Sequence, residues 1–421
     1  MTQSVISSQR YEYPLKEKAC RCALHSSIEE VAEEWDWIAP KHNLFLQSTY
    51  LRIVEKNPPK GMQFAYLLFY RDNTPIGICY FQIKHFKADQ SLNTPTKGED
   101  KPPCFFNTIG RYLKGLVASK VEFNTLVCGN LLLTGAHGFY FDPEKVDGEA
   151  SLRLIDEAID NLYGEFEKRK LPIAGTLMKD FSASEHTFYQ QFSTKHEFNE
   201  FTIQPSMIFD LPESWNNFDD YLGAMSSKYR VRAKRAFKKG KEVEKRELDL
   251  AAIEANLPRI YELYQNIAEN AGFNMVDLNE DYLLNLKRNL PDQFTMMGYY
   301  LEDKLIAFFT TIHNGSELEA HFLGFEKHYN RSIQVYLNIL YDIVRIGLEK
   351  QVKTIVFART ALEIKSSVGA VAEEMYCYMK HRSAFSNKFL QPLLGYLRPK
   401  EEWVPRSPFK TKEPNQEGGD S

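Results

Sequence analysis

The chain has 421 residues, of which 43% are hydrophobic and 26% are charged, and its formal net charge is −4. This composition is typical of a globular protein, and the length is sufficient for two domains. No apolar run approaches the roughly 18 residues that a membrane-spanning helix needs. The polar stretch Met1–Arg10 lacks the apolar segment of a secretory signal, so we expect none.

The six cysteines are scattered along the chain, and no two of them have the C-x-x-C spacing of a metal or redox pair. Cys79 and Cys128 fall in apolar stretches that are typical of strands. This pattern favours buried free thiols in a reducing compartment, and therefore a cytoplasmic location. Cys20 and Cys22 are too close together for a good structural zinc pair, so we expect no metal site.

The first half of the chain is predicted to mix helices and strands. Residues 1–27 show no regular pattern and are expected to be flexible. The elements that follow are expected to be helices at 28–38 and 48–56, a hairpin at 62–86, a polar loop at 87–103, a helix at 108–119, a strand at 121–127, a helix at 152–166 and a strand at 173–178. The polar loop is rich in proline, and we expect it to be a mobile lid.

Three glycines and a histidine occupy the segment Cys128–Gly138, which separates a predicted strand from a predicted helix. Backbone N–H groups in such a segment can bind a phosphate, and His137 could carry a proton or contact a ligand. A tight bend would need the same small residues, and a single loop histidine is often structural. Both interpretations follow from the sequence.

The most charged segment is a predicted helix that begins at Ser226-Ser227-Lys228 and stays basic through Arg230 to Lys241. One interpretation is a solvated basic face. A second is a surface for a phosphate-rich ligand such as coenzyme A, an acyl carrier protein or tRNA. A third is peripheral contact with a membrane, which the absence of a strong apolar stripe disfavours.

The clearest pattern in the chain lies between Gln293 and Gly369. Asn314-Gly315 is a strong hairpin signal, because both residues tolerate positive φ. In the strand after it, Glu319 and His321 share one face. The expected elements of this stretch are strands at 293–300, 305–312 and 317–322, a helix at 333–348 and a strand at 353–357. Beyond it we expect a strand at 375–381, a helix at 385–395 and a disordered tail at 399–421.

The two halves of the chain repeat one another. Gln63-Phe64 and Ile76 have counterparts at the same spacing in Gln293-Phe294 and Ile306, and the order of elements is the same in both halves. We therefore predict an α/β (α+β) protein of two similar units, each a mixed sheet flanked by helices. The predicted first unit covers residues 28–211, and the second covers residues 212–398.

This order of elements resembles the GNAT acyltransferase fold, and two such units in one chain resemble the FemAB-like peptidoglycan aminoacyltransferases and related N-acyltransferases. Three segments in the second half carry the resemblance: Ser226–Arg230, His321–Phe325, and Val356–Lys365 with Gly369, which is similar to the family's "FGR…YK…G" signature. Ala358 and Ile364 depart from that signature. The GNAT pyrophosphate motif is absent, which disfavours acetyl-CoA as the donor, and no tRNA-binding coiled-coil insertion is seen.

The resemblance implies direct attack of an amine on a thioester or ester, with no nucleophile from the enzyme. Such a site needs a base and donors for an oxyanion. Glu319 and His321 are the candidate catalytic residues, although both also fit the polar face of a half-exposed strand. Arg359 and Lys365 are candidates to bind a phosphate or carboxylate, with an ion pair to Glu363 as the alternative. Arg331 and Ser332 lie where a helix begins, which suits a diphosphate.

The sequence thus predicts a cytoplasmic N-acyltransferase whose active site lies in the second unit. Its co-substrate would be acyl-CoA or an acyl carrier protein, with no permanently bound cofactor, and its acceptor a small amine such as a cell-envelope precursor or an amino-lipid. Aminoacyl transfer from tRNA to a peptidoglycan precursor is an alternative. A non-catalytic binding protein on the same fold is a third possibility, which the change to Ala358 slightly favours.

Overall fold

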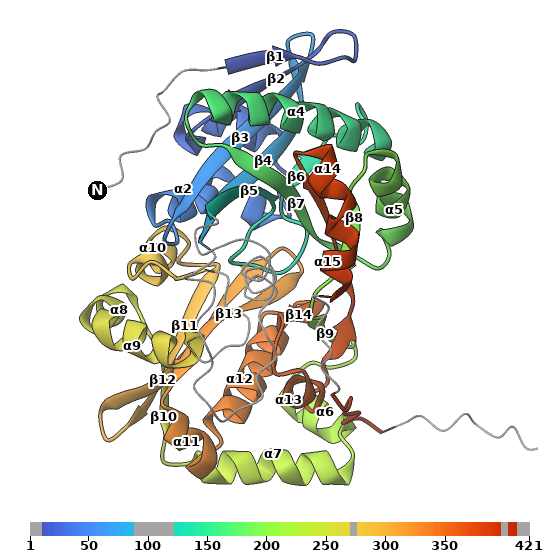
Figure 1. The fold of residues 1–421 in the computed structure, drawn as a ribbon. Coiled ribbons are helices and arrows are strands. Elements are labelled where there is room, and N and C mark those ends of the chain that lie inside the picture. Colours follow the sequence, from blue (N-terminus) through green and yellow to red (C-terminus); the bar gives the residue numbers. More distant parts are fainter. Residues whose placement is uncertain (1–10, 88–121, 270–275, 397–402, 411–421) are drawn as a thin grey trace, which may run out of the picture.

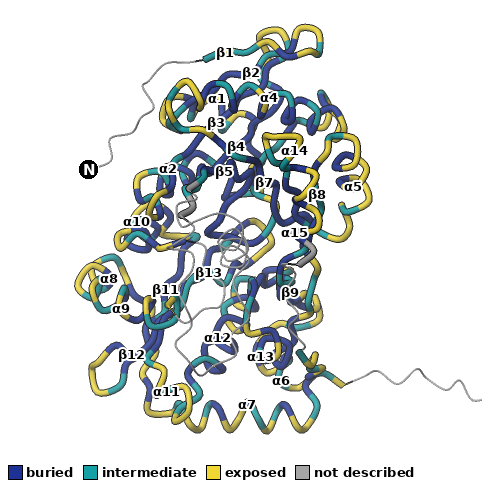
Figure 2. Tube along the Cα trace, viewed as in Figure 1, coloured by how far each residue is buried: buried dark blue, intermediate teal, exposed yellow. Residues whose placement is uncertain are grey.

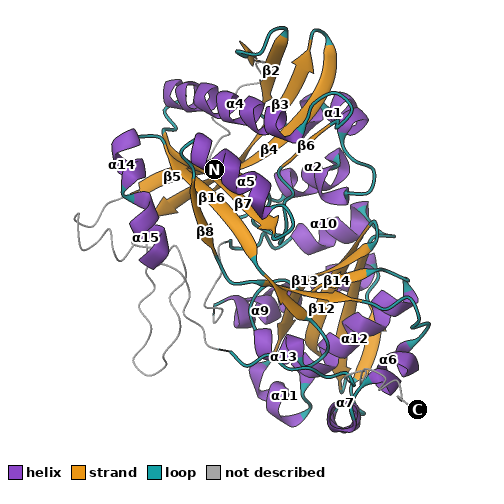
Figure 3. Ribbon diagram, turned by 90° about the vertical axis from the view of Figure 1, so that its right-hand side faces the viewer, coloured by secondary structure: helices purple, strands orange, loops and turns teal. Residues whose placement is uncertain are grey.

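The computed structural model describes residues 11–87, 122–269, 276–396 and 403–410 (Figure 1). Two β-sheets lie one above the other in the view of Figure 1, and Figure 3 shows the same molecule turned about the vertical axis. The predicted lid at 87–103, apart from Lys87, and the predicted helix at 108–119 lie outside the described residues.

The first sheet carries most of the strands from the first half of the chain. Its order is β1 (Tyr11–Pro14), β2 (Cys20–His25), β3 (Met62–Arg71), β4 (Thr74–Lys87), β5 (Glu122–Cys128), β7 (Ile173–Ser182), β16 (Met375–His381) and β8 (Asn199–Thr202), with β6 (Phe139–Phe141) paired to β4. All neighbouring strands are antiparallel except β5 and β7. Helix α4 (Gly148–Lys168) makes the crossover between these two parallel strands.

The second sheet repeats this plan. Its order is β10 (Glu244–Glu247), β11 (Phe294–Leu301), β12 (Lys304–Asn314), β13 (Glu317–Phe325), β14 (Thr354–Val356), β9 (Ser206–Asp210) and β15 (Val371–Glu373). Here β13 and β14 are the parallel pair, and α12 (Val335–Glu349) makes the crossover. The prediction of two similar mixed sheets flanked by helices is confirmed.

The remaining helices cover the faces and ends of the two sheets. They are α1 (Ala32–Ile38), α2 (Ser48–Lys56), α5 (His186–Lys195), α6 (Phe218–Ala224), α7 (Ser227–Lys239), α8 (Leu250–Ala255), α9 (Leu257–Ala268), α10 (Tyr282–Asn289), α11 (Lys327–Ser332), α13 (Leu362–Ser366), α14 (Ala384–Lys388) and α15 (Leu390–Tyr396), with short 3₁₀ turns at Ile28–Glu30 and Leu44–Leu46. One hydrophobic core contains side chains from both sheets, from Trp35 and Tyr50 to Tyr282 and Phe308. The two units are therefore packed together rather than joined only by a linker (Figure 2).

The last strand of each half lies in the other half's sheet. Strand β9 is the last strand of the first half, yet it lies between β14 and β15 of the second sheet. Strand β16 is the last strand of the second half, yet it lies between β7 and β8 of the first sheet. We call this arrangement the strand exchange. A strand was predicted at 375–381, but its place in the first sheet was not.

Two segments differ from the prediction. Residues 11–25 were expected to be flexible, but they form β1 and β2, because β2 pairs with β3 at the edge of the first sheet and Cys20, Cys22 and Leu24 join its hydrophobic core. Residues 403–410 were expected to be disordered, but Phe409 stacks on Phe209 with ring centroids 5.8 Å apart. In both places a few apolar side chains supply the burial that orders a polar segment.

The described cysteines are free and buried, as predicted. Cys79 and Cys128 lie beside each other in the first sheet, with sulfur atoms 3.7 Å apart. Among the described helices, none is long and apolar enough to cross a membrane.

The turn between β12 and β13 is where the second sheet meets the first unit. Gly315 has φ of +61°, and a Cβ atom there would lie 2.6 Å from the carbonyl oxygen of His42. The side chain of Asn314 accepts a hydrogen bond from the backbone N–H of Leu44 at 2.7 Å. The predicted hairpin turn therefore also forms part of the contact between units.

Replacing Gly315 with alanine is expected to lower the free energy of unfolding by about 1–3 kcal/mol, because the new Cβ meets both a left-handed backbone and a carbonyl group. Urea denaturation of the two proteins measures this difference. Gly164 in α4 is the matched control, since a Cβ there meets nothing within 4 Å. Its replacement by alanine should leave stability unchanged or raise it. Equal effects at the two positions would contradict the expectation.

Candidate active site

The parallel strands β13 and β14 pair only over Glu317–Glu319 and Thr354–Val356. Beyond Glu319, β13 continues to Phe325 without pairing to β14, which ends at Val356. The register of β13 against β12 shifts at the same place, and the hydroxyl of Thr310 accepts the backbone N–H of Phe322 at 2.9 Å. Irregularities of this kind are frequent beside active sites. Glu319 and His321 lie at this point.

Glu319 is a buried carboxyl group, exposed by only 4%. Burial raises its pKa well above the ordinary value, and the charge of Glu317 adds to the effect. Three groups act to lower this pKa: Lys179, the backbone N–H of Thr134 and Lys365. Burial lowers the pKa of Lys365 to about 7, while Glu319 acts to raise it. Burial therefore moves the pKa values of this carboxyl group and this amine towards each other, and perturbed pKa values of this kind are frequent at functional sites.

Lys365 and Arg359 follow β14 but do not reach solvent. The Nζ atom of Lys365 donates to the carbonyl oxygens of Arg359 and Ala358, at 2.5 and 3.3 Å. Ala358 itself has φ of +56°, so the backbone keeps at this position the conformation that the family's glycine favours. Lys365 therefore holds this turn closed, and its ammonium group is not free to bind a phosphate.

Arg359 crosses between the units. It forms a buried ion pair with Asp180 of β7, with Nη1 3.2 Å from Oδ2, and its Nε donates to the carbonyl oxygen of Gln204 at 2.9 Å. Lys179 pairs with the same carboxylate. Burial acts to raise the pKa of Asp180, but the two cations lower it far below its ordinary value. The predicted alternative, a pair with Glu363, is wrong, because Glu363 pairs with Arg406.

His321 lies on β13 and contacts helix α10. Its Nε2 atom is 3.0 Å from the hydroxyl of Tyr282 in α10, and burial lowers its pKa to about 3. The ring is therefore neutral at pH 7. Its other nitrogen, Nδ1, is buried and has no hydrogen-bond partner among the described residues.

His137 and the glycine segment are packed inside the first unit. The ring of His137 packs edge-on against Phe45 with centroids 4.9 Å apart, and its Nε2 is 3.1 Å from the carbonyl oxygen of Thr134. Burial lowers its pKa to about 4, and the charge of Lys179 adds to this. The backbone N–H groups of Leu131 and Leu132 already bond to buried side chains. The segment thus has the character of a tight bend.

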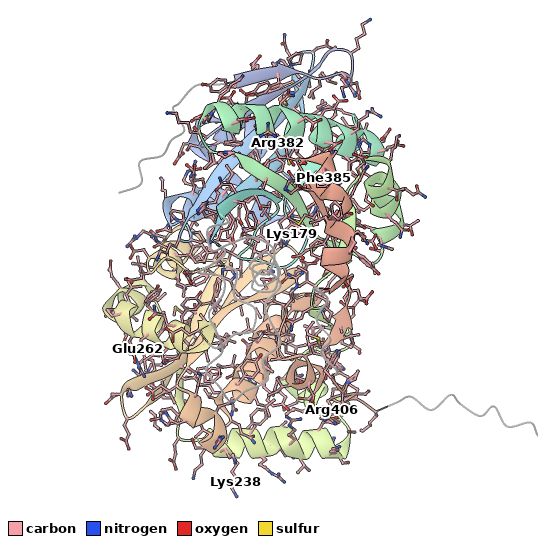
Figure 4. All side chains as sticks on the ribbon, in the orientation of Figure 1. Lys179, Lys238, Glu262, Arg382, Phe385 and Arg406 are labelled. Carbon is pink, nitrogen blue, oxygen red and sulfur yellow. The ribbon has the colours of Figure 1, made fainter. Side chains whose placement is uncertain are left out.

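The other predicted residues lie away from Glu319. Arg331 and Ser332 are exposed at the end of α11, just before α12 begins. Lys239 of the basic helix α7 donates to the carbonyl oxygen of Arg331 at 3.4 Å. Lys228 and Arg230 lie at the opposite end of α7. Figure 4 shows Lys179 between the sheets and Lys238 of α7 at the far end of the molecule. The predicted site residues therefore form a buried group and an exposed basic group.

Sequence reasoning missed Lys179, Asp180, Asn130, Tyr50 and Tyr282, all of which are buried around the site. The sequence contains one signal that could have revealed two of these residues. Lys179-Asp180 places two charges inside an otherwise apolar strand, and buried charges are rare unless they are paired. Among the described residues, no group of acidic, histidine and cysteine side chains is arranged to hold a metal ion.

Residues 227–366 match the family described as acetyltransferase (GNAT) domain. This range contains α7, the sheet from β10 to β14, and both Glu319 and His321. The second unit therefore contains a GNAT domain, and the first unit repeats its plan of strands and crossover helix. No curated protein sequence matches the chain.

One of the solved structures compared shares the fold, and two others are more distantly similar. The chain is similar to FemX, with a TM-score of 0.50 and 12% identity over 82% of this chain and 95% of that one. It is also similar to the C-terminal domain of a putative lysylphosphatidylglycerol synthetase from Agrobacterium fabrum (TM-score 0.46, 9% identity, 88% and 98% covered). A third is a tandem GNAT protein from the clavulanic acid biosynthesis pathway (0.46, 8%, 80% and 88%). The predicted resemblance to FemAB-like GNAT proteins is confirmed at the level of the fold.

Proposed function

We propose that the protein is an N-acyltransferase that moves an acyl group from the thioester of coenzyme A or an acyl carrier protein to an amine. The observation that carries the proposal is Glu319, a buried carboxyl group with a raised pKa, placed where the pairing of β13 with β14 ends. A buried group of this kind is the base that attack by an amine requires, because its pKa is closer to the working pH.

In the proposed reaction, the amine nitrogen of the acceptor attacks the carbonyl carbon of the thioester. A C–N bond forms, and Glu319 takes the proton that the nitrogen loses. The tetrahedral intermediate then collapses and the C–S bond breaks, and the thiolate takes the proton that Glu319 had accepted, so that it leaves as a thiol and the base is regenerated. The enzyme forms no covalent bond with the acyl group. It positions the two substrates and keeps water out of the buried site.

The anionic part of the donor is proposed to bind between α7 and the start of α12. Lys238 and Lys239 are exposed at the end of α7, and Arg331 and Ser332 are exposed beside them. The positive charges there suit the phosphates of coenzyme A or the phosphopantetheine of a carrier protein. Lys228 and Arg230 extend the basic surface to the other end of α7, where a carrier protein is large enough to reach.

Thermal unfolding with separate ligands tests the donor class. Coenzyme A, acetyl-CoA, palmitoyl-CoA, an acyl carrier protein and bulk tRNA would each be added at about 100 times the expected dissociation constant, where a ligand stabilises the fold by about 2.7 kcal/mol. A shift with an acyl-CoA or the carrier protein alone supports the proposal. A shift with tRNA alone favours aminoacyl transfer, and no shift with any of them favours a non-catalytic binding protein.

Replacing Arg331 with alanine is expected to reduce the stabilisation by a thioester donor, because it removes a cation next to the proposed phosphates. An exposed ion contact of this kind is worth about 0.5–1 kcal/mol, or a few-fold in affinity. Titration of the unfolding temperature with the donor measures the change. Lys388 of α14 is an exposed cation outside the GNAT domain and is the matched control. An equal loss of affinity in both variants would contradict a specific donor site.

The acceptor is proposed to be a small amine, such as a cell-envelope precursor or an amino-lipid, and the protein is proposed to act in the cytoplasm. The free, buried cysteines support a reducing compartment. Peripheral membrane contact through α7 would bring an amino-lipid to the site. Val231 is the large apolar side chain that α7 exposes, at 55%, so such contact would rest mainly on charge.

A further inference from the structure

A chain of buried hydrogen bonds runs from the first unit to His321. The Nδ2 atom of Asn130 is 3.2 Å from the hydroxyl of Tyr50. That hydroxyl is 3.1 Å from the hydroxyl of Tyr282, which in turn is 3.0 Å from Nε2 of His321. Asn130, Tyr50 and Tyr282 have no exposed surface. Each hydroxyl in the chain therefore has to satisfy its hydrogen bonds with the next group along.

The first link has a defined direction. The Oδ1 atom of Asn130 accepts the backbone N–H of Leu132 at 2.9 Å and the side-chain amide of Gln82 at 3.1 Å. Gln82 is itself oriented, because its Oε1 accepts the backbone N–H of Leu131 at 2.8 Å. A backbone N–H cannot act as an acceptor. The amide of Asn130 is therefore fixed with its NH₂ group towards Tyr50, and Tyr50 accepts from it.

The rest of the chain follows from the first link. Tyr50 carries one hydroxyl hydrogen, and the acceptor in reach is the oxygen of Tyr282, so Tyr50 donates to Tyr282. Tyr282 then donates to Nε2 of His321. In the reverse direction, the hydroxyl hydrogen of Tyr50 would be buried without an acceptor, which costs about 1–3 kcal/mol. A nitrogen that accepts a hydrogen bond carries no proton, so the proton of a neutral His321 lies on Nδ1.

We infer that this chain holds His321 as the Nδ1–H tautomer, so that His321 is a hydrogen-bond donor for the thioester carbonyl oxygen and not the base. The assignment to the carbonyl oxygen rests on the proposed function, whereas the tautomer rests on the hydrogen bonds alone. Nδ1 is the nitrogen that is buried without a partner among the described residues. A donor kept unpaired in a buried site is positioned for the charge that develops on a tetrahedral intermediate.

Two consequences follow for the site. Glu319 and His321 divide the chemistry, since Glu319 takes the proton and His321 stabilises the oxyanion. Tyr50 and Asn130 of the first unit become positioning residues, because they act on the reaction through Tyr282 and His321. The first unit therefore supplies part of the active site of the second, although residues 227–366 alone match the acetyltransferase domain.

The tautomer is tested by ¹⁵N NMR of the whole protein labelled in its histidine rings. Long-range ring correlations at pH 7 distinguish a protonated Nδ1 from a protonated Nε2, and the spectrum of His321→Gln assigns the signal. We expect a neutral ring with its proton on Nδ1. Tyr282→Phe should produce a mixture of tautomers, because Nε2 loses its donor. Tyr341→Phe, which removes a buried hydroxyl outside the chain, should leave the signal unchanged. A proton on Nε2 in the wild-type protein would overturn the inference.

The donor role is tested by steady-state kinetics with the thioester that binds. His321→Ala is expected to lower kcat by about 10²-fold with little change in KM, as loss of an oxyanion donor does. His321→Asn keeps an N–H donor but cannot act as a base at this pH, and it should recover part of the rate. A wild-type kcat in His321→Ala would overturn the donor role. If no thioester reacts with the wild-type protein, the proposed function fails, and the NMR result still decides the tautomer.

Discussion

Glutamine in place of Glu319 is expected to lower kcat by about 10²–10⁴-fold, the contribution of a positioned base. The change keeps the size of the side chain and its ability to accept the backbone N–H of Thr134, but it removes the group that takes the proton. The rate of amide formation from the donor and a small amine measures the effect. In the wild-type protein, the acid limb of the pH profile should lie above the ordinary range of a glutamate, because burial raises the pKa of Glu319.

The stability of the same variant separates chemistry from folding. The folded protein binds the proton of Glu319 more tightly than the unfolded chain, so the charged form is disfavoured in the fold at pH values above the ordinary pKa of glutamate. Glu319→Gln should therefore be as stable as the wild-type protein at pH 7, or more stable. Glu349→Gln, at an exposed position of α12, is the matched control and should retain its rate. An active Glu319→Gln protein would eliminate Glu319 as the base.

Asp180→Ala is expected to lower the free energy of unfolding by about 3–5 kcal/mol, since it leaves Arg359 and Lys179 buried and close together without their carboxylate. Both cations are less than 10% exposed. Asp180 also has φ of +66°, which an aspartate tolerates better than an alanine does. Asparagine tolerates a positive φ as aspartate does. Asp180→Asn therefore removes the charge without straining the backbone, and its comparison with Asp180→Ala separates the two effects. Equilibrium denaturation at pH 7 measures both variants.

The dependence of stability on pH shows whether the charge of Asp180 stabilises the fold. The pKa of Asp180 is depressed in the fold, so its stabilisation is complete above the ordinary pKa of an aspartate and is lost as the pH falls towards the folded value. The wild-type protein and Asp180→Asn should therefore converge in stability in acid. Arg406→Ala, which breaks an exposed pair with Glu363, should change stability little. A small effect of Asp180→Ala at neutral pH would contradict this account of the interface.

The order of elements could be predicted because it follows from local patterns. The alternation in β13, the Asn314-Gly315 turn and the helical period of α12 are each encoded within a few residues, and the repeat of that order gave the two-unit fold. The strands at 11–25 escaped notice because their burial depends on β3, which is far away in the chain. Local patterns do not record a distant partner, so pairing between distant segments was the part that failed.

The candidate site also contains residues that local patterns predict and residues that depend on distant partners. Glu319 and His321 were recognised because they share one face of a predicted strand. Arg359 was assigned to a ligand because a sequence does not show that Asp180, in the other unit, occupies its guanidinium group. Tyr50 falls in the helix predicted at 48–56, and its hydroxyl is significant only through Asn130 and Tyr282. Residues that act through others are visible only when the fold brings them together.

The strand exchange has a consequence for the ancestry of the protein and for its dissection. Two identical chains that trade their last strands form a domain-swapped dimer, and joining such chains end to end would give the topology seen here. Neither half can then complete its sheet without the other: a fragment that starts at 212 lacks β9, and one that ends at 211 lacks β16. Separately expressed halves should thus be poorly folded alone and should restore the native sheets only as a heterodimer when they are mixed.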